Sequence, residues 1–213
     1  MQVTLILIVT INMEAATICT MMTLREKNRR RMLSETQREA MKLFLSRGFG
    51  AVLVDDIAAA VGVAGSTIYR HFKTKESIVL WDEHDEVLDA VLTEHLTKQA
   101  PLAAIRDAFV ETLAERYQTD FVFQLARVRF IFATPALHAA AIEADFRARD
   151  ELTRALTQTL SAKHKAAAPL LAGASLLALD VAMDRWQQDK GRHGLDTLIA
   201  EEFDRLSNLA AIE

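Results

Sequence analysis

Residue types that could recognise a nucleic acid gather in one short segment, GVAGSTIYRHFKTKE, from Gly62 to Glu76. The segment combines hydroxyl, phenol, imidazole, guanidinium and ammonium donors with small residues. On a helix that enters a DNA groove, such donors suit hydrogen bonds to phosphate oxygens and to base edges. The candidate DNA contacts are Gly65, Ser66, Thr67, Tyr69, Arg70, His71, Lys73 and Lys75.

These candidates are expected to play different roles. The small residues at 65–67 suit the tip of a helix that approaches the bases, and the donors at 69–71 suit flanks that reach phosphate. Lys73 and Lys75 lie beside the start of the next helix, where backbone N–H groups also favour a phosphate. The alternative is a helical hairpin whose charged side chains are simply solvated.

Two short helices must position the donors, and the residues before the segment form the first. Residues 54–61 begin with two aspartates near their start, which the helix dipole favours in a first turn. Gly62 then permits a left-handed conformation that turns the chain sharply into the second helix. Ile57 and Ile68 would fill the core between the two helices, so the pattern predicts a helix-turn-helix.

Charge is distributed unevenly along the chain. From Arg25 to Lys75 there are eleven Lys and Arg against five Asp and Glu, a net of +6, so the other residues carry −10 of the total of −4. A basic segment on an acidic body indicates that one end of the protein meets a polyanion. Five of the basic residues lie in REKNRRR (25–31), which lacks apolar periodicity and is expected to be a flexible lead-in.

Residues 1–24 are expected to be a disordered extension, or one that a mis-called start has added. The apolar run at 3–11 is too short for a membrane span, which needs about 20 apolar residues. A signal peptide would carry Lys or Arg before that run, and none occurs there. We therefore expect no membrane partner and a cytoplasmic location.

The rest of the chain has the pattern of helices. Gly (7) and Pro (3) are scarce among 213 residues, and apolar residues recur at helical spacing without a convincing alternation. A long fourth helix is expected from Lys75 to about Leu96, with apolar stripes on two faces. The other expected helices cover 34–48, 101–117, 121–132, 135–163, a stretch that begins at Pro169, and a last one from Leu195. The predicted fold class is all-α, with about nine helices.

The segment from about Arg29 to Ile78 resembles the DNA-binding domain of the TetR family of transcriptional repressors, on the motifs LF…RGF, DIA..VGV, TIYRHF and TKE. The resemblance implies nine or ten helices, homodimers on palindromic double-stranded operators, and release when a small molecule fills the C-terminal domain. Four candidate contacts match the family's usual DNA-contacting places: Thr67, Tyr69, His71 and Lys75. At 64–65 the chain has alanine and glycine, where many members have a hydroxyl cap and a basic residue or proline.

The C-terminal part is similar to the TetR subgroup that binds acyl-coenzyme-A-like ligands, on FQLARVRFIFATPAL (123–137), LALDVAMDRWQQ (176–187) and WDEHD (81–85). The phenylalanines of 121–132 exceed what one buried stripe requires, and the arginines among them could meet a phosphate or carboxylate. The alternative is that the phenylalanines are core and the arginines pair with nearby acids. The candidate ligand contacts are Phe109, Phe123, Arg127, Arg129, Phe130, His138 and Trp186.

Enzymatic and metal-binding motifs are missing. Cys19 is the single cysteine, so neither an intrachain disulfide nor a thiolate zinc site can form. The Glu-x-x-His, His-Glu-x-x-His, Gly-x-Ser-x-Gly and phosphate-loop patterns do not occur. His84 and His95 share a helix face with acids nearby, but a solvated acidic face explains them better than a metal site. No catalytic residue, metal or cofactor is expected.

The sequence therefore predicts three parts: an extension at 1–24, a helix-turn-helix domain at 25–76, and a ligand-binding and dimerisation domain at 77–213. The predicted function is that of a homodimeric repressor released from its operator by a small apolar or acyl-thioester effector. Two alternatives stay open. One is a dimeric helical ligand-binding or scaffold protein without operator recognition, and the other is an activator with the same fold.

Overall fold

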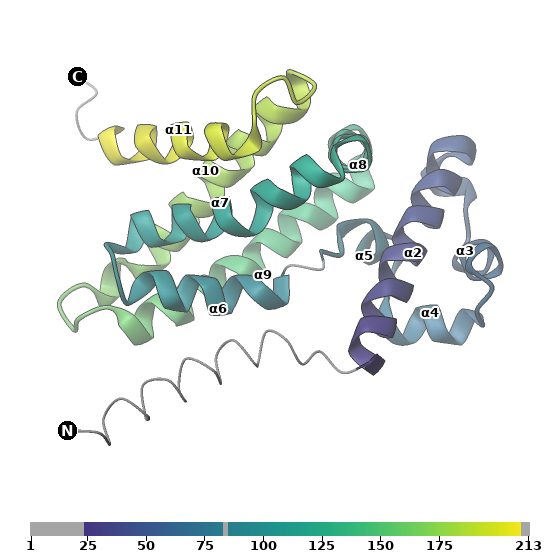
Figure 1. The fold of residues 1–213 in the computed structure, drawn as a ribbon, viewed down its shortest axis with the longest axis horizontal. Coiled ribbons are helices and arrows are strands. Elements are labelled where there is room, and N and C mark those ends of the chain that lie inside the picture. The colour runs from purple at the N-terminus through teal and green to yellow at the C-terminus, as the bar shows by residue number, and fades with distance from the viewer. Residues whose placement is uncertain (1–23, 83–84, 210–213) are drawn as a thin grey trace, which may run out of the picture. The chain divides into compact units, whose positions relative to one another are not determined.

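The computed structural model describes residues 24–82 and 85–209, so the predicted extension at 1–24 lies almost wholly outside the described residues. The chain divides into two compact units, Met1–Lys73 and Thr74–Glu213. The described residues form ten α-helices and two short 3-10 helices without a strand, which confirms the all-α prediction (Figure 1). The elements of the first unit are α2 (Leu24–Arg47), η1 (Phe49–Ala51), α3 (Val54–Val61) and α4 (Gly65–His71). Those of the second unit are α5 (Lys75–Leu80), α6 (Asp85–Leu96), α7 (Pro101–Thr119), α8 (Phe121–Ala133), α9 (Pro135–Thr159), η2 (Lys165–Ala167), α10 (Ala168–Gln188) and α11 (Leu195–Asn208).

In the first unit, α2 packs against α3, and α3 packs against α4. Phe44 of α2 is buried and lies 4.9 Å, ring centroid to ring centroid, from Phe49 of η1. Asp56 joins the two ends of this connection, because its carboxylate accepts from the Leu53 N–H at 2.8 Å and pairs with Arg47 at 3.2 Å. These contacts fix the start of α3, from which the helix-turn-helix follows.

The basic segment 25–31 is helical, so the prediction of a flexible lead-in was wrong. It forms the first turns of α2, because Arg, Lys and Glu are good helix formers and no Gly or Pro interrupts them. Arg31 pairs with Glu35 one turn later at 2.8 Å. Thr36 is buried within the helix, and its hydroxyl donates to the Met32 carbonyl.

The second unit is a helical bundle in which α7 packs against α6 and α11, and α10 packs against α9 and α11 (Figure 1). Each of α7, α9 and α10 has proline in its first turn, where the missing N–H costs no hydrogen bond. Residues 165–188 are long and apolar enough to cross a membrane. Within the unit, Ala172, Ala182 and Trp186 of this stretch are buried.

The long fourth helix predicted from Lys75 to Leu96 is two helices, α5 and α6. The helix stops at Trp81, whose backbone leaves the helical region (φ −56°, ψ 131°). The Trp81 carbonyl accepts instead from the Arg127 guanidinium of α8 at 2.9 Å. A tertiary contact therefore replaces the helical hydrogen bond that local sequence would favour.

Candidate DNA interface and effector cavity

The turn between α3 and α4 has the conformation that the sequence predicted. Gly62 is left-handed (φ 76°, ψ 30°). The Val63 N–H donates to the Ala58 carbonyl at 3.0 Å, and the Gly62 N–H to the Ala59 carbonyl at 3.3 Å, so the free carbonyls at the end of α3 are satisfied. A side chain with a Cβ would be strained at Gly62, because L-residues rarely adopt this φ.

One face of α4 is buried and the other is open to solvent. Ile68 is fully buried, and Phe72, which ends the helix, is also buried. On the opposite face Tyr69 is 53% exposed, and Arg70 and Ser66 are exposed as well. Beyond the helix end, Lys73 is exposed too. The buried face anchors the helix and leaves a phenol, a hydroxyl and two cations free to reach DNA.

Gly65 and Thr67 are less exposed to solvent than Ser66, Tyr69 and Arg70. A Cβ added at Gly65 would lie 2.6 Å from Oδ1 of Asp55, so a larger residue at this position would require the exposed Asp55 carboxylate to move. Thr67 is half-buried, and its N–H donates to the Ala64 carbonyl at 2.9 Å in the first turn. The contacts of both residues with DNA remain predictions.

His71 lies half-buried at the end of α4. Burial lowers the pKa of its imidazole, and the positive charges of Arg70 and Arg29 lower it further. The protein without DNA therefore favours the neutral ring. A nearby phosphate would have the opposite effect, because a negative charge favours the imidazolium.

Lys75 belongs to the second unit, of which α5 is the first helix. Thr74 caps α5: its hydroxyl accepts from the Ser77 N–H at 3.1 Å, and Ser77 Oγ accepts from the Thr74 N–H at 3.2 Å. This reciprocal pair fixes Lys75 as the first helical residue. The predicted DNA contacts therefore comprise seven residues of the first unit and one of the second.

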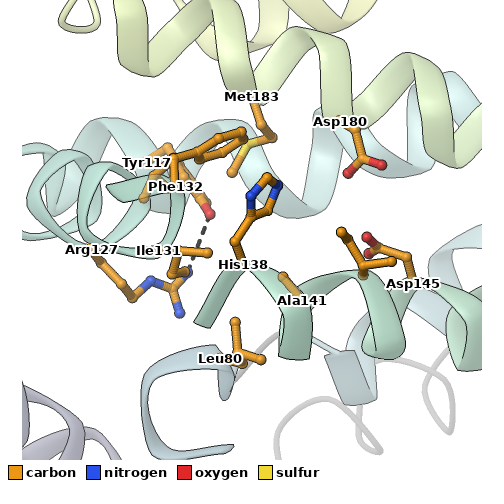
Figure 2. Close-up of a pocket in the computed structure, with 12 residues that line it drawn as sticks. Leu80, Tyr117, Arg127, Ile131, Phe132, His138, Ala141, Asp145, Asp180 and Met183 are labelled. Carbon is orange, nitrogen blue, oxygen red and sulfur yellow. Dashed lines mark hydrogen bonds between the residues drawn. The ribbon is translucent and has the colours of Figure 1, made fainter. Parts of the chain in front are cut away.

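The second unit contains a cavity of about 220 Å³ (Figure 2). Its apolar wall consists of Leu80, Val128, Ile131, Phe132, Ala141, Ile142 and Met183. Its polar residues are Tyr117, Arg127, His138, Asp145 and Asp180. Helices α5, α7, α8, α9 and α10 each contribute at least one of these residues, so the space lies among five helices.

Arg127 forms one polar end of the cavity and is only 4% exposed. Its guanidinium donates to the Trp81 carbonyl, to the Tyr117 hydroxyl at 3.2 Å, and to the Asp82 carboxylate at 3.3 Å (Figure 2 shows the Tyr117 bond). Asp82 also pairs with Arg116. Burial acts to lower the pKa of Arg127, but Tyr117 and Asp82 outweigh it and the net shift is upward. Arg127 therefore stays charged while holding the segment that follows α5.

Two carboxylates form the other polar end. Asp145 of α9 and Asp180 of α10 face each other, and His138 lies between them and Tyr117 (Figure 2). Asp145 is half-buried, whereas Asp180 reaches solvent where the cavity opens. Protein on either side nevertheless removes part of the hydration of Asp180, and with the charge of Asp145 raises its pKa to about 6. Burial also raises the pKa of Asp145, which the nearby His138 partly opposes.

The cavity contains two of the seven predicted ligand residues, Arg127 and His138. Phe109 and Trp186 are buried in the hydrophobic core. The remaining predicted residues do not line the cavity: Phe123 and Phe130 are half-buried, and Arg129 is exposed. Arg127 pairs with an acid, as the alternative reading of the arginines expected.

Sequence reasoning missed Tyr117, Asp145, Asp180 and Met183 as cavity residues. Asp180 carried a signal, because it interrupts the apolar run LLALDVAM of α10. An acid inside such a run indicates either a turn to solvent or a polar site. Asp145 stands among exposed charged neighbours on α9, and nothing in its local pattern distinguishes it.

Two protein-family models match the chain. The model for bacterial regulatory proteins of the tetR family matches residues 38–80, which contain the helix-turn-helix. The model for the MftR C-terminal domain matches residues 99–210, more than half of the chain.

Individual proteins agree with these matches. The HTH-type transcriptional regulator TcmR of Streptomyces glaucescens is 31% identical over 148 residues, which are 66% of this chain and 64% of TcmR. The mycofactocin biosynthesis transcriptional regulator MftR of Mycobacterium tuberculosis is 29% identical over 102 residues, which are 47% of this chain and 51% of MftR. The chain thus spans less than two thirds of the length of either relative.

Among solved structures, the TetR-family repressor FadR of Thermus thermophilus, in complex with lauroyl-CoA, has the same fold. It shares 20% identity and a TM-score of 0.51, and the match covers 85% of this chain and 96% of FadR. With one family model on the helix-turn-helix and another on most of the second unit, the chain belongs to the TetR family of bacterial regulators, whose members are DNA-binding transcriptional regulators and not enzymes.

Proposed function

We propose that this protein is a ligand-responsive transcriptional repressor that binds a palindromic operator as a homodimer and acts in the cytoplasm. The observation that carries the proposal is the outward face of α4, where Tyr69 and Arg70 are exposed behind a turn fixed by Gly62. A short helix anchored on one face and polar on the other suits entry into a major groove. The net charge of +6 over residues 25–75 would attract the phosphate backbone.

The dimer is supported by apolar surface on α10. Leu170 is 77% exposed, Leu177 63% and Val181 39%, although all three lie on a helix whose other side is core. A second copy packed on α10 and α11 would cover this stripe in a four-helix bundle. Two recognition helices would then meet half-sites about one DNA turn apart, roughly 34–36 Å.

Release of the operator would follow from occupancy of the cavity. A ligand in the cavity contacts Leu80, the last residue of α5, and Arg127, which holds the carbonyl of the next residue, Trp81. The ligand can therefore favour one position of α5 over another. Because Lys75 is the first residue of α5, a change in the position of this helix would also move a predicted DNA contact. A typical coupling of about 1–3 kcal/mol weakens DNA binding roughly 5–150-fold, which is enough to switch a promoter.

For the effector, the sequence prediction is a long-chain acyl thioester or another amphipathic anion with an apolar tail. The apolar wall of the cavity and the lauroyl-CoA complex of FadR support an acyl chain. A volume of about 220 Å³ is below the ~300–1,000 Å³ usual for ligand pockets, so a long chain would need the cavity to open further.

Operator binding can be tested by gel shift with the DNA that flanks the protein's own gene, at 50 and 200 mM salt. The affinity should fall by about a thousandfold or more between these salt concentrations if six or more phosphates are contacted. Arg70→Ala should weaken binding, whereas Arg154→Ala, an exposed cation of α9, should not. Absence of a salt-sensitive complex would favour the ligand-binding or scaffold alternative. A reporter gene whose expression falls when the protein is deleted would favour the activator.

A further inference from the structure

We propose that the cavity binds a small amphipathic amine, with its ammonium group beside Asp145 and Asp180, its apolar body against the wall, and a hydrogen-bond acceptor facing Arg127. The proposal rests on the proposed function only in treating the cavity as the effector site, and it replaces the acyl-thioester effector with an amine. Binding itself can be measured without DNA. Three features of the cavity lead to this class of ligand.

The first feature is the unpaired acid end. Within the described part of the chain, no side chain donates a hydrogen bond or forms an ion pair with Asp145 or Asp180, although the two face each other (Figure 2). Two neighbouring carboxylates repel each other, so they favour a cation between them. Among the described residues no group of three His, Cys, Asp or Glu is placed to hold a metal ion. An organic cation therefore suits this end better than a metal.

The second feature is the unused donor at the opposite end. Arg127 is buried and lines the cavity, yet its Nε–H finds no acceptor among the described residues. Its terminal nitrogens are already engaged by Trp81, Tyr117 and Asp82. The Nε atom is itself buried, so a hydroxyl or carbonyl oxygen of a ligand would satisfy this N–H once the guanidinium turned towards the cavity.

The third feature is the wall between the two ends. Ile131, Phe132 and Met183 line it with side chains that are apolar and, for Met183, adaptable (Figure 2). His138 is drawn between Tyr117 and the carboxylates. A ligand that spans the cavity thus needs an apolar body with polar groups at its ends. An anionic head at the acid end would be repelled by both carboxylates.

A matched set of probes tests the charge preference: octylamine, octan-1-ol and octanoate, each titrated into the full-length protein by calorimetry at pH 8. At this pH Asp180 is ionised, because its pKa is about 6. Octylamine should bind roughly tenfold to 100-fold more tightly than octan-1-ol, as for a hydrogen bond to a charged group, and octanoate should bind least. At the other end, 6-aminohexan-1-ol should bind roughly threefold to tenfold more tightly than hexylamine.

The double variant Asp145→Asn/Asp180→Asn should lose the preference for octylamine over octan-1-ol. Asp150→Asn is the matched control, since this exposed acid of α9 pairs with Arg149 and does not line the cavity. Melting temperatures would confirm that each variant is folded. Equal affinity for the amine and the alcohol, retention of the preference in the double variant, or tighter binding of octanoate or lauroyl-CoA would overturn the proposal. Amine binding that leaves operator complexes intact would support the proposal and contradict the cavity's role as the effector site.

Discussion

Arg127→Ala should destabilise the protein, because this residue is a buried structural link as well as a cavity residue. The substitution removes hydrogen bonds to the Trp81 carbonyl and the Tyr117 hydroxyl, and it breaks the pair with Asp82, which still pairs with Arg116. Breaking a buried charge pair usually costs about 3–5 kcal/mol. Since Asp82 still pairs with Arg116, we expect the lower end, a loss of about 3 kcal/mol in the free energy of unfolding.

The matched control is Arg129→Ala, because this arginine is exposed on the same helix and should change the free energy of unfolding by less than about 0.5 kcal/mol. A chain of this size loses roughly 2–4 °C of melting temperature per kcal/mol, so Arg127→Ala should lower it by about 6–12 °C. Thermal unfolding followed by circular dichroism measures both variants. If Arg127→Ala has the same melting temperature as Arg129→Ala and the wild type, the hydrogen bonds of Arg127 to the end of α5 contribute nothing to stability. The proposed structural link is then refuted.

Three further predictions concern DNA binding and assembly. Lys73→Ala and Lys75→Ala should each weaken binding to all sequences alike and lower the magnitude of the salt slope by about 1, and an unchanged slope in filter binding would argue against phosphate contacts. Leu177→Glu should give monomers by sedimentation and lose operator binding, since it places a charge in the exposed apolar stripe of α10. A wild-type protein that is monomeric at micromolar concentration would contradict this prediction. Operator affinity should rise as the pH falls towards the range where His71 protonates. The pKa of His71 is lowered in the free protein, and a DNA phosphate nearby would raise that pKa. His71→Gln should remove this pH dependence in anisotropy titrations.

The fold could be predicted from local patterns where the cause was local. Gly62 is left-handed because the chain must turn between two short helices, and the prolines stand in first turns because their geometry allows no other helical place. The helix over 25–31 was missed because the absence of an apolar stripe was taken for disorder. That segment needs no buried face, since it extends a helix that Phe44 and Met41 anchor further on.

The break at Trp81 and the cavity residues could not be read in the same way, because their causes lie far apart in the sequence. Arg127 bonds the Trp81 carbonyl across 46 residues. Phe109 and Trp186 were predicted as ligand contacts from their type, yet both pack in the core, where Phe109 meets Phe203 edge to face. Aromatic type alone does not distinguish a core residue from a cavity wall.

Arg127 gives a physical reason why the cavity and the end of α5 should respond together. The same guanidinium lines the cavity and holds the Trp81 carbonyl, so a ligand acceptor that draws it towards its free Nε–H must alter that bond. Asp82 limits how far the guanidinium can move, because it pairs with both Arg127 and Arg116. A ligand that moves Arg127 would therefore also act on the segment that follows α5, and a ligand can switch DNA affinity only through such a difference between two states.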